Sequence, residues 1–385
     1  MAVTKRQGKN GVAYRVTVDV AADPLTGKRR RSTETFRTKK EADAREREWL
    51  IDIERGTAVD GTKMTVTELF ALWLDVLRGT NPKERTVIEY ERTIKTHIIP
   101  VLGTTAVQKV TPATIDAFNI ALRDKGCSDS MVHRCHKRLR QAFDYGLKRR
   151  IIAVNPMLAI DPPTVRARPA VVLTGPQIGR FLTIAGNDAY SPLWLLFVQT
   201  GMRRGEVLAL RWQDIDLNKR QVRVRQCIEE INGKVHLTTP KTPAALRTIT
   251  LFPESVAALR THHDRQTFQR QAAGDQWRDC DLVFASETGG PLTPSNALRN
   301  LYAIITKANK EAKTEDDRLP RFHIHDLRHT HATHLLMDRW DVARVARRLG
   351  HANPAITLKL YAHAITDVQD DDLATPAAFA FAGTA

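Results

Sequence analysis

The stretch His325-Asp326-Leu327-Arg328-His329 lies near the carboxyl end of a 385-residue chain and combines side chains that bind anions with side chains that move protons. In a helix, His325 and Arg328 share one face, because residues three apart are neighbours on the helix surface. A second short stretch, Leu349-Gly350-His351, follows, and Tyr361 comes ten residues after its histidine. The region therefore offers a cation, imidazoles and a phenol that could act as a nucleophile.

Two further stretches lie upstream. Thr200-Gly201-Met202-Arg203-Arg204-Gly205-Glu206 predicts that one helix ends at its first glycine and that another begins around Arg203. A guanidinium at a helix start suits a phosphate, and Glu206 can hold it by an ion pair. Pro240-Lys241-Thr242 lies on a predicted turn between two strands. Each piece alone is also typical of an ordinary solvated surface.

Together, the four stretches resemble the tyrosine recombinase (phage integrase) family, and they follow its order over residues 170–365. The matching patterns are T-G-x-R-x-x-E, P-K-T, H-x-L-R-H and L-G-H followed by the tyrosine. Ala245 departs from the family, which often has serine near the hairpin lysine, so one backbone or phosphate contact is in doubt. The catalytic residues that the resemblance implies are Arg203, Lys241, His325, Arg328, His351 and Tyr361.

The resemblance also assigns roles, and physical chemistry agrees with them. Arg203 and Arg328 would clamp the scissile phosphate, because phosphoryl transfer depends mainly on positioning and on stabilising charge at the non-bridging oxygens. Tyr361 has a reference pKa of about 10 and needs a base, for which His325 is the candidate. Lys241 would protonate the departing 5′ oxygen. No acidic triad suggests a Mg²⁺ site, so we expect neither metal nor cofactor, and the phosphotyrosyl link would make ATP unnecessary.

The charge balance points to a polyanionic partner. Lys and Arg number 59 against 43 Asp and Glu, a formal net charge of +16. Such an excess favours nucleic acid over an anionic membrane surface or a merely solvated basic face. No apolar run approaches the roughly 18 residues of a membrane helix. The four cysteines are scattered without C-x-x-C spacing, so they indicate no disulfide framework or zinc ribbon, and a reducing cytoplasm fits.

The amino-terminal segment predicts a small sheet backed by one helix, which we assign to a domain over residues 1–57. Residues 12–20 alternate as a half-buried strand does, a turn follows, and a second strand closes near Phe36. Thr38 and Glu41 form a capping box at the start of the helix. The second strand could lie in a DNA groove, or its charges could simply protect a sheet edge. Its basic residues are Lys28, Arg29, Arg30 and Arg31.

A helical bundle is predicted over residues 64–160. Thr65 and Glu68 form a second capping box, and a helix around Tyr90 is expected to stop before Pro100. The last helix begins at Ser128 and has a basic face, which could contact phosphates or could be solvated only. The basic residues proposed to bind DNA there are Arg134, Lys137 and Arg138.

Residues 161–169 read as a proline-stiffened linker, and a catalytic domain follows over 170–385. It should be mainly helical with a three-stranded antiparallel sheet made by residues 221–226, 235–238 and 247–251, with a hairpin turn at Asn232-Gly233. The predicted fold class is therefore α+β: a mainly helical, multidomain protein with a small β-sheet plus helix domain, a helical bundle and a helical catalytic domain.

The resemblance implies arm-type DNA binding by residues 1–57, core-site binding by 64–160, and a homo-tetramer acting on double-stranded DNA. An integrase of a phage or other mobile element fits best, with accessory directionality or DNA-bending proteins as possible partners. The alternatives are a type IB topoisomerase, a dimer-resolution recombinase, a DNA-binding protein without catalysis, and a zinc enzyme that uses the histidines around residue 325. We also hypothesise that the tail, with Phe379 and Phe381, docks on a neighbouring protomer, although a disordered tail is an equal alternative.

Overall fold

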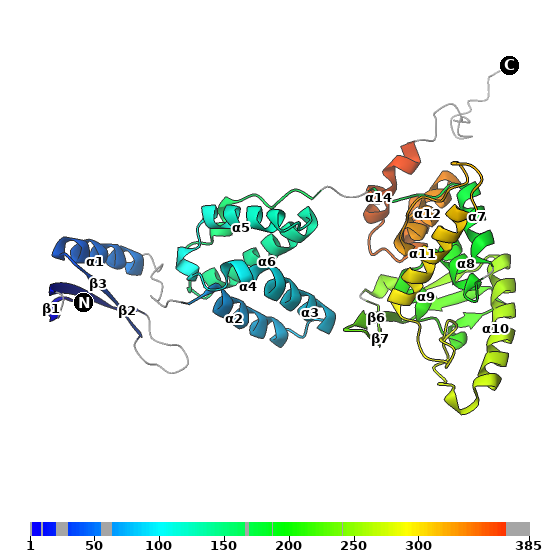
Figure 1. Ribbon diagram of the computed structural model, residues 1–385, viewed down its shortest axis with the longest axis horizontal. Coiled ribbons are helices and arrows are strands. Elements are labelled where there is room, and N and C mark those ends of the chain that lie inside the picture. The colour runs from blue at the N-terminus through cyan, green and yellow to red at the C-terminus, as the bar shows by residue number, and fades with distance from the viewer. Residues whose placement is uncertain are drawn as a thin grey trace, which may run out of the picture. The chain divides into compact units, whose positions relative to one another are not determined.

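The computed structural model describes residues 2–8, 11–20, 30–54, 64–165, 169–186, 188–240 and 242–366. It divides into two compact units, Met1–Ala167 and Arg168–Ala385, and its fold is mainly helical with small antiparallel sheets, as predicted (Figure 1). Some residues singled out in the sequence lie outside the described part of the chain: Lys28, Arg29, Lys241 and the tail from residue 367.

The first unit begins with an antiparallel sheet in the order β1-β2-β3. Its strands and helix are β1 (Ala2–Gly8), β2 (Gly11–Val20), β3 (Arg30–Phe36) and α1 (Lys39–Glu54). Val16, Ala42 and Trp49 form a small core between sheet and helix. The predicted capping box is present, since the backbone N–H of Glu41 donates to the Thr38 hydroxyl. The first strand was not predicted, because its sequence is mostly polar and lacks a clear apolar face.

The rest of the first unit is a bundle of helices with a continuous apolar core. Its elements are α2 (Val66–Gly79), α3 (Glu84–Thr93), η1 (Ile94–Ile98), α4 (Ile99–Leu102), η2 (Val107–Lys109), α5 (Pro112–Asp124), α6 (Asp129–Lys148) and η3 (Pro156–Ala159). The prediction that a helix stops before Pro100 is wrong. The chain continues through it to Leu102, because η1 is a π-helical turn that shifts the hydrogen-bond register just before the proline.

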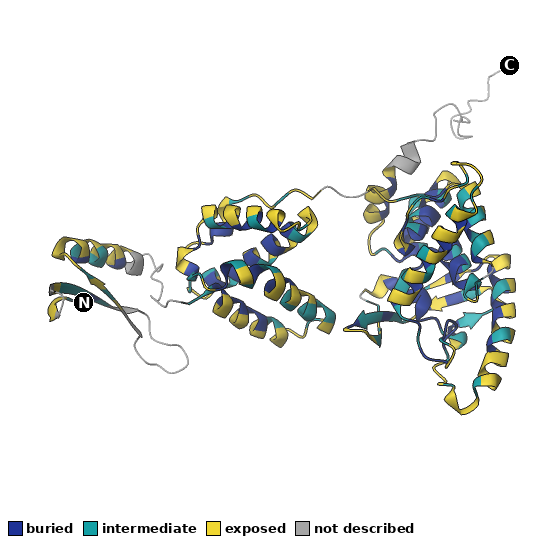
Figure 2. Ribbon diagram, in the orientation of Figure 1, coloured by how far each residue is buried: buried dark blue, intermediate teal, exposed yellow. Residues whose placement is uncertain are grey.

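The second unit surrounds a larger apolar core with helices and two small sheets. Its helices are α7 (Gly175–Ala185), α8 (Ser191–Thr200), α9 (Arg204–Leu208), η4 (Trp212–Asp214), η5 (Pro243–Ala245), α10 (Pro253–Ala273), η6 (Gly274–Gln276), α11 (Pro294–Lys310), α12 (Ile324–Met337), α13 (Val342–Leu349) and α14 (Pro354–Thr366). Its strands are β4 (Ile215–Asp216), β5 (Gln221–Val224), β6 (Cys227–Ile231), β7 (Lys234–Thr238) and β8 (Arg247–Thr250). In Figure 2, the buried faces of the helices turn inward onto the strands.

The strands of this unit pair differently from the prediction. The three-stranded sheet has the order β4-β5-β8, and β7 pairs with β6 in a separate hairpin. The predicted turn at Asn232-Gly233 is present, and both residues have positive φ. The chain leaves β5 after Val224, where the Gln226 side chain donates to the carbonyl of Ala209. That break separates the hairpin from the sheet, and sequence alternation alone does not reveal it.

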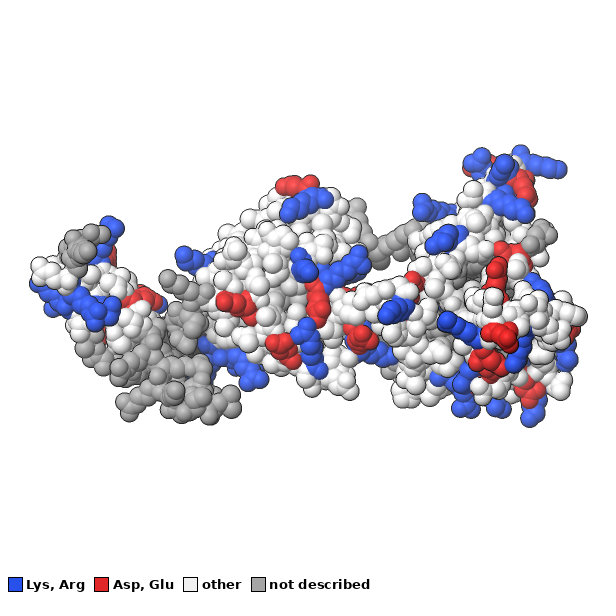
Figure 3. All heavy atoms as spheres, turned by 60° about the horizontal axis from the view of Figure 1, so that its bottom comes forward, with Lys and Arg blue, Asp and Glu red and all other residues white. Residues whose placement is uncertain are grey.

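No helix within the described residues is long and apolar enough to cross a membrane. On the face drawn in Figure 3, Lys and Arg side chains are spread over the described parts of the chain, with acidic side chains among them. On this face, the basic side chains therefore do not gather into a single stripe.

Candidate active site

Arg203 lies at the start of α9, as predicted, and Glu206 holds it from one turn further along. The Glu206 carboxylate accepts from the Arg203 backbone N–H at 3.0 Å and from its Nη1 at 2.8 Å. Burial alone would raise the pKa of Glu206, but the charges and hydrogen bonds of Arg247 and Arg203 lower it. The Arg203 side chain remains 41% exposed. Its guanidinium is therefore fixed at one edge and open at another, as a phosphate ligand requires.

Arg328, in the second turn of α12, is buried with 2% exposure. Its Nη1 donates to the carbonyl of Gly201 at 2.8 Å, whereas its buried Nη2 has no hydrogen-bond partner among the described residues. Burial and then the charges of Arg203 and Arg247 lower its pKa to about 9, so it stays protonated at neutral pH. A buried cation with an unused donor is costly unless an anion joins it.

Gly201 allows this arrangement because it ends α8 in the left-handed conformation, with φ of 62°. A Cβ there would come within 2.6 Å of the His331 ring and 2.8 Å of the Leu349 side chain. The close approach brings α8 against α12 and α13. The chain can therefore present the Gly201 carbonyl to Arg328 only with glycine at this position.

His351 follows Gly350, which ends α13 in a left-handed turn. The His351 Nδ1 is 2.8 Å from the Thr357 hydroxyl, a contact that orients the ring. Burial and then the charges of Arg328 and Arg203 lower the pKa of His351 to about 4. The ring is therefore neutral at physiological pH and can accept or donate a hydrogen bond at the site.

Tyr361 interrupts α14 with non-helical backbone angles, φ −126° and ψ 15°. It is 2% exposed and packs with residues of α12 and α13, including Leu335 and Leu349. Burial raises the pKa of its phenol to about 12, and the charge of Arg328 only partly opposes this. The phenol is therefore protonated at neutral pH in the protein alone.

His325 lies in the first turn of α12 and keeps an exposed edge. Loss of solvent around its ring, and then the charges of His329 and Arg328, lower its pKa to about 4. His329 belongs to the H-x-L-R-H motif but was assigned no catalytic role in the recombinase site, yet its ring centroid lies 4.9 Å from that of His325 and 5.5 Å from that of Tyr361. The two imidazoles and the phenol thus follow one another in space, with His329 in the middle.

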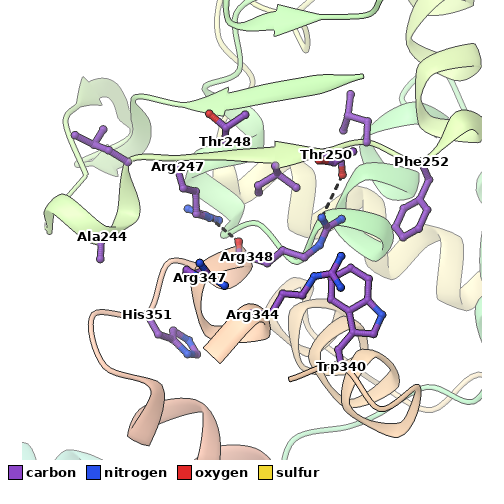
Figure 4. Close-up of a pocket in the computed structure, with 13 residues that line it drawn as sticks. Ala244, Arg247, Thr248, Thr250, Phe252, Trp340, Arg344, Arg347, Arg348 and His351 are labelled. Carbon is purple, nitrogen blue, oxygen red and sulfur yellow. Dashed lines mark hydrogen bonds between the residues drawn. The ribbon is translucent and has the colours of Figure 1, made fainter. Parts of the chain in front are cut away.

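Arg247 is a second residue that sequence reasoning missed. It opens β8, its side chain is 6% exposed, and its Nη2 donates to Glu206 at 2.8 Å. A cavity of about 620 Å³ lies beside it between β8 and α13, and Figure 4 shows Arg344, Arg347 and His351 around the same opening. The sequence shows an arginine at the start of a predicted strand, six residues after Lys241. The alternation of polar and apolar residues in that strand does not tell whether this arginine is buried or exposed to solvent.

Lys241 itself lies outside the described residues. Ala245, where the family often has serine, closes the short helix η5 and is buried. Its carbonyl accepts from Arg247 Nη1 at 3.0 Å. Although alanine replaces the serine that the family often has, the backbone carbonyl at this position still accepts a hydrogen bond from Arg247.

Two of the histidines that a zinc site would use as additional ligands are engaged elsewhere. His331 Nδ1 lies 2.9 Å from the carbonyl of Val198, and its Nε2 accepts from Arg348. His334 Nε2 lies 2.8 Å from the carbonyl of Leu173. Across the described ranges, no three His, Cys, Asp or Glu side chains are grouped so that they could hold a metal ion. These contacts give the zinc interpretation no support.

The predicted DNA-binding residues differ in their surroundings. Arg134 and Lys137 are exposed on α6. Arg138 is partly buried instead, with its guanidinium carbon 3.4 Å from the centroid of the Tyr90 ring, and burial lowers its pKa. Arg30 and Arg31 belong to β3, and their side chains lie outside the described part. Of the three α6 residues, Arg138 therefore contributes to packing within the bundle.

Three family descriptions match successive parts of the chain. The phage integrase family matches residues 172–367, the phage integrase N-terminal SAM-like domain matches 65–120, and the Arm DNA-binding domain matches 3–53. The first match covers the whole constellation from Arg203 to Tyr361. The chain belongs to the phage integrase family, and it is a tyrosine-type site-specific recombinase, an enzyme that transfers DNA strands.

Full-length relatives support this family assignment. The chain is 28% identical to a tyrosine recombinase XerC-like protein of Caldanaerobacter subterraneus subsp. tengcongensis, covering 93% of this chain and 94% of the relative. It is 23% identical to the ICEBs1 integrase of Bacillus subtilis, covering 93% and 95%. The similarity therefore extends over nearly the whole length of each protein.

Solved structures show the same fold. The Tn1549 transposon integrase in complex with a circular intermediate DNA superposes with a TM-score of 0.68 at 23% identity, covering 78% of this chain and 95% of that one. A lambda integrase dimer bound to a core site gives a TM-score of 0.58 at 18% identity, covering 97% of both chains. A lambda integrase tetramer bound to a Holliday junction gives 0.58 at 17%, covering 96% and 97%.

Proposed function

We propose that this recombinase cuts and rejoins DNA through a 3′-phosphotyrosine link to Tyr361, and that it integrates or excises a phage or another mobile element. The observation that carries the proposal is the buried Arg328, whose Nη2 has no partner among the described residues. An uncompensated donor on a buried cation favours an anion of matching geometry, and a phosphodiester accepts a bidentate guanidinium. Arg203, held by Glu206 at its other edge, is the second clamp.

Each step is assigned to a side chain of this molecule. The Tyr361 oxygen attacks the scissile phosphorus, the phenolic proton goes to His325, and the bond from phosphorus to the 5′ oxygen breaks. His325 is neutral at physiological pH because its pKa is about 4, so it is able to accept that proton. Lys241 protonates the departing 5′ oxygen, and His351 donates a hydrogen bond to the phosphate. Rejoining reverses these steps, since the covalent link conserves the energy of the phosphodiester.

Activation of the phenol depends on DNA. In the protein alone, the pKa of Tyr361 is about 12, because its burial outweighs the charge of Arg328. Binding of the scissile phosphate would orient both arginines and bring the developing phenolate into their field. The tyrosine would thus be inert off DNA and reactive only in the assembled complex.

The domain roles extend the proposal. Residues 1–57 bind arm-type sites, 64–160 bind the core site, and 170–385 catalyse strand transfer, each on double-stranded DNA. The matches to the Arm and SAM-like domains support the first two roles. The active assembly is a tetramer, which the lambda integrase tetramer on a Holliday junction supports by analogy. Directionality or DNA-bending proteins would act as accessory partners.

A trapping experiment tests the chemistry. The full chain is incubated in EDTA with nicked duplexes from the DNA that flanks its gene, so that the short downstream fragment with the free 5′ hydroxyl diffuses away and cannot be rejoined. We expect a covalent protein–DNA adduct with the wild type and none with Tyr361→Phe, which should still bind the same DNA. Sequencing the trapped DNA then gives the site. An adduct that survives Tyr361→Phe, or that requires a divalent metal, would contradict the mechanism.

A plasmid assay separates recombination from the topoisomerase alternative. Two copies of the trapped site on one supercoiled plasmid should recombine with each other. Relaxation of a plasmid that contains no site, with no exchange between sites, would instead support a type IB topoisomerase.

A further inference from the structure

Arg247 joins three segments of the catalytic unit that are distant in the sequence. Its Nη2 donates to Glu206 at 2.8 Å, its Nε donates to the carbonyl of Arg348 at 2.7 Å, and its Nη1 donates to the carbonyl of Ala245 at 3.0 Å. Figure 4 shows this side chain leaving β8 and pointing to the end of α13. One buried guanidinium thus contacts α9, the last turn of α13 and the segment that precedes β8.

These contacts form part of a closed ring. Glu206 accepts from Arg247 at one oxygen and from Arg203 Nη1 at the other. Arg203 Nη2 then lies 3.3 Å from the carbonyl of Gly350, two residues beyond the carbonyl that Arg247 binds. The turn that leads to His351 is therefore fixed at two carbonyls by two arginines that share one carboxylate.

Packing leaves little freedom in this ring. A Cβ on Gly350 would come within 2.9 Å of Arg247 Nη1 and 3.1 Å of the carbonyl of Ala244, and Gly350 has φ of 71°. Glu206 is 3% exposed, and so water cannot easily replace a lost arginine there. A displacement of Arg247 would therefore move the turn and the carboxylate together.

We propose that Arg247 is a positioning residue for strand cleavage, which sets Arg203 and His351 relative to each other through Glu206 and the turn at residues 348–350. The inference rests on the proposed function, since it assumes that both residues act on the scissile phosphate. Arg247 also holds the carbonyl of Ala245, on the segment that follows Lys241. The same side chain thereby links that segment to the phosphate clamp.

The role requires a guanidinium and not only a positive charge. Three acceptors on three segments match three nitrogens of a planar fork, whereas a lysine ammonium is a point charge on a flexible stem. Arg247→Lys therefore keeps the charge beside Glu206 but loses contacts to the two carbonyls. We expect the rate of adduct formation at saturating nicked DNA to fall by about 10- to 100-fold, because small misplacements of catalytic groups have effects of that size. The DNA concentration for half-saturation should stay within about twofold, since the Arg247 side chain is 6% exposed and its nitrogens bond acceptors within the protein.

A double-mutant cycle distinguishes positioning from a general loss of stability. In a His351→Ala background, Arg247→Lys should cost at least about threefold less than in the wild type, because one of the groups that it positions is already absent. A purely structural effect would be the same in both backgrounds. Equal costs, or a loss confined to DNA affinity, would overturn the proposal.

Two controls complete the experiment. Arg211→Lys alters another arginine that pairs with a buried carboxylate, Asp214, and it should cleave at the wild-type rate. If Arg247→Lys does not fold, Glu206→Gln keeps the side-chain shape and should show the same reduced cost in the His351→Ala background. Absence of an adduct with the wild type would reject the proposed function itself. A wild-type rate in folded Arg247→Lys, with the wild type active and Tyr361→Phe inactive, would reject only the role of Arg247.

Discussion

Arg328 donates from Nη1 to the carbonyl of Gly201 at 2.8 Å, across 127 positions of sequence, and keeps its Nη2 buried without a partner in the described part of the chain. The site therefore holds a guanidinium that is anchored on one side and unsatisfied on the other. That state is costly for the protein alone and favourable once an anion is bound.

The first prediction concerns this imbalance. Arg328→Met should abolish adduct formation, with a loss of about 10²-fold or more, because it removes a preorganised donor to the transition state. It should leave the Tm unchanged or raise it, since burial of the cation is costly. Differential scanning calorimetry and adduct trapping measure the two effects. A methylphosphonate at the scissile position lacks the negative charge on a non-bridging oxygen. If Arg328→Met cleaves this substrate, the positive charge of Arg328 acts on the charge of the phosphate. A clear fall in Tm would contradict the idea that burial of the Arg328 cation costs stability.

The second prediction is a pH effect from Tyr361. Its folded pKa is raised to about 12 from the ordinary value of about 10. The folded state therefore prefers the neutral phenol, and that contribution to stability is complete below pH 10 and is lost as pH rises toward 12. Chemical denaturation across this window should show the wild type losing stability faster than Tyr361→Phe. Parallel curves for the two proteins would show that the phenol is not buried as described.

The third prediction concerns acid. Burial and then the charge of Arg348 lower the pKa of His331 to about 3, and so the folded state binds its proton less readily than the unfolded state. The stabilisation is present above pH 6.5 and is lost as pH falls from there toward 3. Because His325 and His351 have lowered pKa values too, the catalytic unit should lose stability steeply over this range. Urea denaturation at a series of pH values measures the free energy of unfolding. His331→Gln should make this free energy fall less steeply between pH 6.5 and 3, and an unchanged dependence on pH would count against the prediction.

The fourth prediction uses a matched pair of glycines. Gly201 and Gly233 both have positive φ, but a Cβ at Gly201 meets the His331 ring at 2.6 Å, whereas a Cβ at Gly233 has nothing within 4 Å. Gly233→Ala should cost only the left-handed strain of about 1–2 kcal/mol. Gly201→Ala should cost more, and should also slow cleavage because it moves the carbonyl that anchors Arg328. Equal changes in the free energy of unfolding would show that the contact between α8 and α12 relaxes freely.

The fifth prediction separates DNA contacts from packing on α6. Arg134→Ala and Lys137→Ala should each weaken DNA binding and reduce the slope of log affinity against log salt by about 0.9, the value for one phosphate contact. Arg138→Ala should instead lower the Tm of the bundle, since its guanidinium lies against the Tyr90 ring. Titrations at several salt concentrations, with calorimetry, check all three variants. An unchanged salt slope for Arg134→Ala would remove it from the DNA interface.

Local patterns in the sequence determined much of this protein. The capping boxes at Thr38 and Thr65, the helix that places His325 and Arg328 on one face, and the helix start at Arg203 all appear as predicted. They depend on hydrogen bonds and spacings within a few residues, which a linear pattern contains. The order of the family motifs also identified the catalytic class before any contact between them was known.

Contacts between distant segments were decided only by the tertiary structure. The pairing of β7 with β6, the bonds from Arg247 to Glu206 and to the carbonyl of Arg348, and the burial of Tyr361 all depend on how separate elements pack. The physical reason is that burial and long-range geometry set both the partners of a charge and its pKa. The sequence thus named the groups that we propose for the chemistry, and packing determined that Arg328 keeps a donor without a partner among the described residues whereas Arg247 is bonded to three acceptors.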